Sequence, residues 1–227
     1  MRQDAIHDIE AARKFLKGQP ITKDNICPED YLEIKILENG EVCDVDREEA
    51  LRIVRENVVN DKIVLHMIAV SAIMKELARH LGQDERLWEL AGLLHDIDYE
   101  LTKNEPSRHG LEAERILGGS APSEIIKAIK SHNFENTGVM PESNLEKALI
   151  AADAVSGLII AAALVMPNKK LAEVSVETLK KKFKQKDFAR NVSRERIMFC
   201  EQIGLTLDDF LEISLRALNG ISKELGL

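Results

Sequence analysis

The chain has 227 residues, enough for one large domain or for one domain with a small appendage. Hydrophobic residues make up 44% and charged residues 31% of the sequence, which excludes an intrinsically disordered protein. The net charge of −8 argues against a general nucleic-acid-binding surface, since such a surface usually carries a basic excess. Aromatic residues are only 4%, so the core must consist of Leu, Ile, Val and Ala, a composition that favours helices.

Three scattered cysteines, Cys27, Cys43 and Cys200, have no CxxC spacing. This usage indicates free thiols in a reducing compartment. The N-terminal sequence lacks the apolar core of a signal peptide. Together these features predict a cytoplasmic protein.

Residues 1–45 differ from the rest of the chain and predict a small N-terminal α+β appendage. Residues 4–17 have the apolar spacing of a helix, and residues 31–37 alternate apolar and polar side chains as in a half-buried strand. Asn39 and Gly40 form a typical hairpin turn before a second short strand. The expected appendage is therefore a helix followed by a hairpin.

Residues 46–227 have helical periodicity throughout and predict an all-α domain. Residues that favour helix N-termini precede the apolar stripes, and Gly82 is placed to end the second helix. The expected helices begin near Asp46, Asn60 or Asp61, Asp84, Leu111, Pro122, Asn144, Ser193 and Thr206. Residues 148–166 form an apolar run nearly long enough to span a bilayer, but Asp153 lies inside it. A buried helix at the centre of the domain explains this run without a membrane.

Imidazoles and carboxylates interrupt the apolar faces of four of these expected helices. His66, His95 and His132 each continue an apolar stripe, Asp96 follows His95 at a helix end, and Asp153 lies in the most apolar helix. A buried carboxylate without a partner is strongly unfavourable, whereas a divalent metal takes neutral imidazoles and carboxylates as ligands. Four convergent intrusions therefore predict a metal site, and a buried network of His–Asp hydrogen bonds is the alternative.

The order of these residues is that of a known family. His66, then His95 and Asp96 within GLLHDID, then Asp153 within LEKALIAADAVSG resemble the HD superfamily of metal-dependent phosphohydrolases. The resemblance covers residues 46–166, and the basic C-terminal segment is similar to an uncharacterised bacterial branch of predicted HD hydrolases. It implies an HD-domain helical bundle with these four residues as metal ligands at its centre.

Some HD proteins bind a second metal through two histidines that lie between the HD pair and the last aspartate. His109 in SRHG and His132 in KSHN lie in this interval, so the resemblance implies a second ion bridged by Asp96. For His109 the alternative is an exposed loop histidine. His7 and His80 are expected at the surface, His80 because the negative end of a helix favours a basic side chain.

The sequence after the HD pair departs from the family. It continues with IDYE, with Lys103 further on, where family members often have Ile-Gly and then a lysine. Asp98 is expected to hold a water molecule or to orient a ligand. Asp96, Asp98 and Lys103 are the expected catalytic residues, with Asp98 or Asp153 as the proton acceptor for a metal-activated water that attacks phosphorus.

The negative charge of a phosphorylated substrate requires cations beyond the metal. Arg108 and Lys130 lie near ligand positions in the sequence and are expected to bind the substrate. The basic segment LKKKFKQKDFARNVSRER is a second source, although most of its lysines are expected on a solvated helix face. From this segment, Arg190 or Arg194 is expected to bind phosphate, bidentately where the geometry allows.

These features predict a metal-dependent phosphohydrolase that acts on a phosphomonoester, a nucleotide or a related phosphoester. The expected cofactor is one or two divalent ions, with Mn, Fe, Co, Ni, Zn and Mg not distinguished. The expected partner is a small phosphorylated substrate, first of all a nucleotide; nucleic acid and a membrane are not expected, and a homodimer is left open. The alternatives are a non-catalytic metal- or nucleotide-binding regulatory module and a purely structural helical adaptor.

Overall fold

The computed structural model describes residues 45–227, and within this range the protein is helical and contains no strand. The prediction of an all-α helical bundle is confirmed. The helices are α3 (Arg47–Asn57), α4 (Asp61–Leu81), α5 (Glu85–Leu94), α6 (Tyr99–Thr102), η1 (Pro106–Arg108), α7 (Ala113–Leu117), α8 (Ser123–His132), α9 (Phe134–Thr137), α10 (Asn144–Leu164), η2 (Leu171–Glu173), α11 (Val176–Lys184), α12 (Arg194–Ile197), η3 (Met198–Ile203), α13 (Leu207–Gly220) and α14 (Ser222–Leu225), where η marks a 3-10 helix. The expected helix and hairpin of the N-terminal appendage, with His7, lie outside the described residues.

The chain divides into two units. The larger one consists of residues 46–118 and 124–227. All the candidate site residues named above belong to the larger unit.

Helix starts follow the capping side chains that the sequence offers. Within the described residues, the side chains of seven N-cap residues accept a backbone N–H of the first turn, namely Asp46, Asn60, Asp84, Ser143, Ser175, Ser193 and Thr206. Gly82 ends α4 in the left-handed conformation at φ 64°, which glycine adopts at little cost. Two starts differ slightly from the prediction, because Ser143 rather than Asn144 caps α10 and α7 begins at Ala113.

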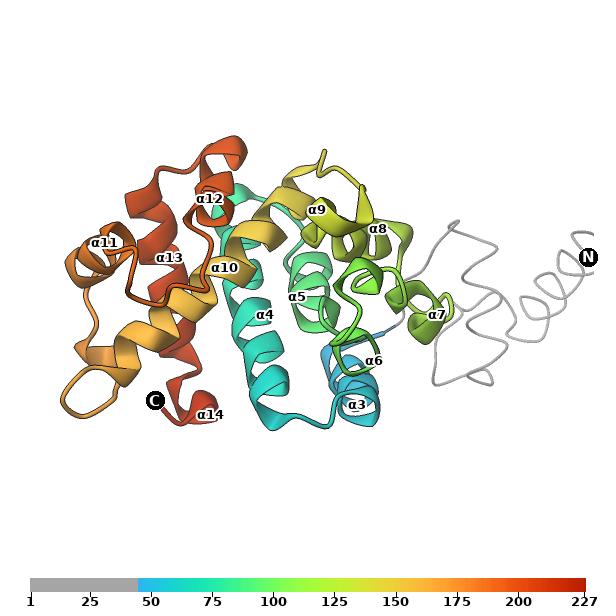
Figure 1. The fold of residues 1–227 in the computed structure, drawn as a ribbon, viewed down its shortest axis with the longest axis horizontal. Coiled ribbons are helices and arrows are strands. Elements are labelled where there is room, and N and C mark those ends of the chain that lie inside the picture. Colours follow the sequence, from blue (N-terminus) through green and yellow to red (C-terminus); the bar gives the residue numbers. More distant parts are fainter. Residues whose placement is uncertain (1–44) are drawn as a thin grey trace, which may run out of the picture. The chain divides into compact units, whose positions relative to one another are not determined.

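α10 lies at the centre of the larger unit and packs against α4, α5, α11, α12 and α13 (Figure 1). Among the described helices it alone is long and apolar enough to cross a membrane, but 61% of its apolar window is buried inside the protein. Its packing on all these neighbours is that of a core helix, as the sequence predicts.

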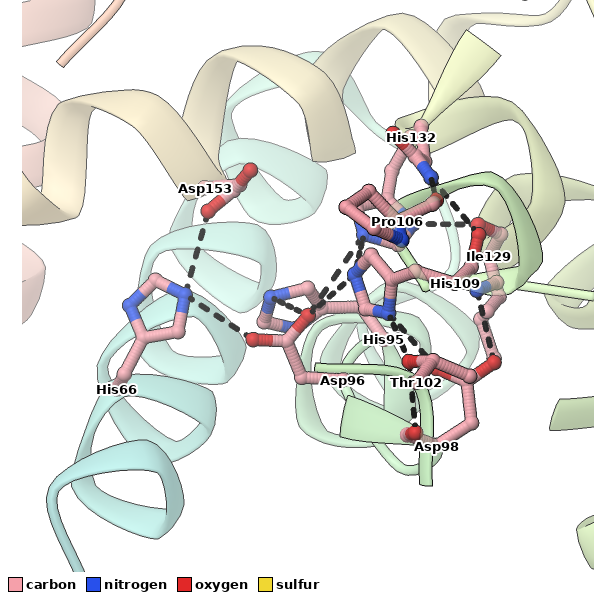
Figure 2. Close-up of polar contacts among 12 residues, drawn as sticks. His66, His95, Asp96, Asp98, Thr102, Pro106, His109, Ile129, His132 and Asp153 are labelled. Carbon is pink, nitrogen blue, oxygen red and sulfur yellow. Dashed lines mark hydrogen bonds and ion pairs between the residues drawn. The ribbon is translucent and has the colours of Figure 1, made fainter. Parts of the chain in front are cut away.

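α4 and α5 approach each other closely, and this contact positions the HD pair. A Cβ atom on Gly92 would lie 2.8 Å from the Cα atom of Ser71 in α4, so only glycine fits here. The tight contact brings the C-terminal end of α5, where His95 and Asp96 lie, against the face of α4 that carries His66 (Figure 2).

Candidate metal centre

Four imidazoles and two carboxylates from five parts of the chain converge in the larger unit (Figure 2). The ligand candidates are His66 from α4, His95 and Asp96 from the end of α5, His109 from the loop after η1, His132 from the end of α8 and Asp153 from α10. All six residues that the sequence proposed as ligands are therefore neighbours, although the chain separates the first from the last by 87 positions, the difference between 153 and 66.

The Asp96 carboxylate lies between two groups of ligands. Its Oδ1 atom is 3.4 Å from Nε2 of His95, 3.2 Å from Nε2 of His109 and 3.6 Å from Nε2 of His132. Its Oδ2 atom faces Nε2 of His66 at 3.8 Å. Two groups able to hold an ion result, one with His66, His95 and Asp96 and one with Asp96, His109 and His132.

All four imidazoles present the same nitrogen to the centre, because each Nδ1 atom is held by a group outside it. Nδ1 of each ring contacts an oxygen atom, and these oxygens are Ser156 Oγ for His66, the Gly92 carbonyl for His95, Asp98 Oδ1 for His109 and the Ile129 carbonyl for His132. The Ser156 hydroxyl donates its own hydrogen to the Asp153 carbonyl, so it accepts from His66. Outer hydrogen bonds of this kind fix the tautomer in which Nε2 carries the free lone pair, as metal-binding histidines require.

The separations of the inner atoms suit a shared ion. Two ligand atoms at about 2.1 Å from one metal lie about 3.0 Å apart at a right angle and about 3.4 Å apart at the tetrahedral angle. Nε2 of His109 and Nε2 of His132 are 3.0 Å apart, and Nε2 of His66 is 3.2 Å from Asp153 Oδ1. Nε2 of His95 is buried without a hydrogen-bond partner among the described residues, and a metal ion is a partner that would satisfy it.

The electrostatics of the cluster favour a bound cation. Burial raises the pKa of Asp96, but the surrounding imidazoles more than offset this effect and hold its pKa well below the usual range. Burial lowers the pKa of His95 to about 4, so its ring is neutral at pH 7, the form that binds a metal. Burial also lowers the pKa of His109, but hydrogen bonds to Asp96 and Asp98 outweigh it and raise this pKa to about 10. A metal ion entering here replaces a proton.

Hydrogen bonds from Asn133 and a close backbone contact with Ile129 hold the loop that carries His109 in place. The side-chain amide of Asn133 donates to the carbonyls of Pro106 and His109, each at 2.9 Å. Gly110 has φ 88°, and a Cβ atom there would lie 2.8 Å from the Ile129 carbonyl. These contacts hold His109 in the cluster, so the alternative of an exposed loop histidine does not apply.

Asp98 is fully buried and faces this loop. Oδ1 accepts from Nδ1 of His109 at 2.9 Å, and Oδ2 accepts from the backbone N–H groups of Gly110 at 2.8 Å and Glu112 at 3.1 Å. These three bonds fit the expectation that Asp98 orients a ligand, and they leave it engaged with the loop rather than directed at a substrate.

The cations expected near the substrate form ion pairs away from the cluster. Lys103, which is 53% exposed, pairs with Glu100 at 3.5 Å. Arg108 pairs with Glu105 and Glu112, and Lys130 pairs with Glu114 at 2.6 Å. None of these pairs involves a candidate ligand.

The basic C-terminal segment reaches the centre through a residue other than the expected ones. Arg190 is exposed, and the Arg194 guanidinium is surrounded by the backbone carbonyls of Lys182, Phe183, Gln185, Phe188, Ala189 and Val192, which it donates to. Arg196, in contrast, donates from Nη2 to the His132 carbonyl and lies 3.5 Å from Asp153 Oδ2. Two residues two positions apart on a helix point in different directions, but the sequence did not show which of Arg194 and Arg196 faces the centre.

Ser156 is the other contributor that the sequence analysis did not single out. It lies three residues after Asp153, on the same face of α10, and this spacing is a signal that the sequence contained.

An all-helical bundle with converging imidazoles and carboxylates at its core defines a helical domain with residues that could hold a metal ion. Residues 63–158 match the HD domain family, so the chain contains an HD domain, a type of domain typical of metal-dependent phosphohydrolases. The predicted resemblance is confirmed. Arg196 lies outside the matched region.

Proteins named ribonuclease Y are similar to the same part of the chain. Those of Acholeplasma laidlawii and Aquifex aeolicus are each 35% identical to it, over 98 and 100 residues, and that of Oleidesulfovibrio alaskensis is 32% identical over 101 residues. The matched stretches are 41–43% of this chain and 17–18% of those relatives, so the chain spans only a small part of their length. No solved structure matches the chain significantly.

Proposed function

We propose that this protein is a metal-dependent phosphohydrolase that acts on a small phosphoester, with a nucleotide as the first candidate substrate. The observation that carries this proposal is the arrangement around Asp96, whose two oxygens face the Nε2 atoms of two groups of imidazoles. When bound there, a divalent ion supplies a Lewis acid for a phosphoryl oxygen and lowers the pKa of a water molecule toward neutrality.

The chain's own residues have distinct parts in this proposal. His66, His95, Asp96 and Asp153 hold one ion, and Asp96, His109 and His132 hold a second. Of the two expected proton acceptors, Asp98 is engaged by the 109–112 loop through all three hydrogen bonds to its carboxylate, which leaves Asp153 as the remaining candidate.

The test combines metal analysis with a phosphatase screen. The purified protein is expected to bind a transition metal and to hydrolyse a member of a panel of nucleotides and phosphomonoesters in the presence of Mn, Co or Ni. His95→Ala and Asp96→Ala are each expected to lose both metal and activity. Full activity in either variant contradicts the assignment, and turnover of any phosphoester argues against the non-catalytic regulatory alternative.

A second candidate is hydrolysis of phosphodiester bonds in RNA. It is favoured by the similarity of residues in the HD domain to proteins named ribonuclease Y. Against it stands the net charge of −8, which gives little general attraction to a polyanion. Adding a single-stranded RNA to the panel separates the two candidates, because cleavage of the RNA with no release of phosphate from nucleotides selects the second.

A further inference from the structure

Within the part of the chain that matches the HD family, no lysine or arginine forms an ion pair with a candidate ligand. Lys103, Arg108 and Lys130 are each paired with glutamates outside the cluster. Carboxylates also line the site, and their charge opposes the approach of a phosphate. A positive side chain close to the candidate ligands would reduce this repulsion.

Among the lysines and arginines of residues 45–227, only Arg196 forms an ion pair with a candidate ligand. It lies in α12, which packs on α10, and its Nη2 atom reaches both the His132 carbonyl and Asp153 Oδ2. His132 belongs to one group of ligands, and Asp153 contacts His66 of the other. The guanidinium is therefore fixed beside both groups.

One nitrogen of the Arg196 guanidinium, Nη1, has no partner among the described residues. It forms no hydrogen bond or ion pair with any residue in the range 45–227, whereas Nε is enclosed by the protein. A phosphoryl oxygen that accepts from Nη1 would add a charge-assisted hydrogen bond, which is stronger than a bond between neutral groups. Nη1 carries two N–H groups, and the side chain is 23% exposed.

We propose that Arg196 binds the phosphoryl oxygens of the substrate, so that the C-terminal segment completes a site whose metal ligands come from the HD domain. This inference rests on the proposed function. The contacts of Nη2 with Asp153 and the His132 carbonyl anchor the guanidinium, and Nη1 donates to the phosphate. The competing role is that Arg196 only positions Asp153 as a ligand.

Inorganic phosphate is the probe that tests this role without turnover. Its dissociation constant is measured by calorimetry on the metal-loaded protein for wild type, Arg196→Gln and Arg196→Lys, together with the metal affinity of each. The matched control is Lys186→Gln, which removes an exposed cation from the same basic segment. We expect phosphate to bind Arg196→Gln about 10- to 100-fold more weakly, as loss of a hydrogen bond between charged groups predicts.

The other variants give the pattern that identifies the role. Arg196→Lys keeps the charge but loses the guanidinium, so part of the affinity is expected to return, whereas Lys186→Gln is expected to bind phosphate like the wild type. The metal affinity is expected to change less than threefold, or about 0.7 kcal/mol, in every variant, because none of the substitutions removes a candidate metal ligand. If Arg196→Gln does not fold, Arg196→Lys carries the test, with an expected loss of about tenfold.

Three results overturn the inference. One is unchanged phosphate affinity in Arg196→Gln, or in Arg196→Lys where that variant carries the test. Another is a loss of metal affinity with phosphate binding retained on the loaded protein, which assigns Arg196 to positioning Asp153. The third is a loaded wild-type protein that does not bind phosphate. A protein that hydrolyses no phosphoester but binds phosphate through Arg196 refutes the proposed function and leaves this inference standing.

Discussion

Replacing Asp98 with asparagine tests whether a residue outside the metal shell sets the tautomer of a ligand. The buried Asp98 carboxylate accepts from Nδ1 of His109 and from the backbone N–H groups of Gly110 and Glu112. In Asp98→Asn the amide oxygen can keep the two backbone donors, which turns its NH2 group toward His109. Nδ1 must then accept, so the proton moves to Nε2, and His109 no longer offers a lone pair to a metal.

The size of the effect follows from the number and kind of bonds. Two charge-assisted bonds to backbone become neutral ones, and at about 1 kcal/mol each the free energy of unfolding falls by about 2 kcal/mol. Loss of a histidine's outer partner typically weakens a metal site 10- to 100-fold, so the site formed with Asp96 and His132 is expected to weaken by about that factor. The fold is expected to survive because the side chain keeps its shape.

Metal titration by calorimetry and urea denaturation of the metal-free protein give these two quantities separately. The matched control is Asp187→Asn, which alters an exposed aspartate. An Asp98→Asn protein that binds as many ions as the wild type, with unchanged affinities, refutes the reasoning about the tautomer. A loss of stability with metal binding intact assigns Asp98 to folding of the loop alone.

Three further predictions concern the scaffold. Gly92→Ala places a Cβ atom 2.8 Å from the backbone of Ser71 and is expected to lower the free energy of unfolding by about 1–3 kcal/mol in urea, whereas Gly220→Ala, with nothing within 4 Å, is expected to cost nothing. Arg194→Ala leaves the carbonyls of residues 182–192 without their shared donor, and we expect a loss of about 2–4 kcal/mol together with faster proteolysis within this stretch. The buried Cys200 thiol, with its pKa raised by burial to about 11, is expected to resist Ellman's reagent at pH 8 until the protein unfolds, in a variant whose other cysteines are serine. The thiol of the unfolded chain ionises at about pH 8.5, before that of the folded protein. The contribution of this group to stability is therefore present below about pH 8.5 and falls as the pH rises toward 11. Rapid labelling of the folded protein at pH 8 would contradict the burial.

Local chemistry made much of the fold readable along the chain. An N-cap side chain bonds a backbone N–H group only two or three residues away, so the signal for a helix start is local in the sequence. For this reason the starts at Asp46, Asn60, Asp84 and Thr206 were predicted correctly, as was the end at the left-handed Gly82. The short helices α6 and α9, of four residues each, were not predicted. Their length is too small for a periodic pattern to be recognised, and packing on neighbouring segments determines them.

The sequence by itself determined most ligand candidates, because an imidazole or carboxylate on an apolar stripe is visible from spacing alone; His109, in a loop, came from the family resemblance. It did not determine which cation lies beside them. Arg190, Arg194 and Arg196 share one basic segment, and their order along the chain carries no information about which side chain faces α8 and α10. Only the packing of α12 on α10 decided that Arg194 binds the carbonyls of its own loop and Arg196 reaches His132 and Asp153. The physical reason is that apolar periodicity specifies which face of a helix is buried, whereas the partners of a polar side chain depend on segments that folding brings together from distant parts of the sequence.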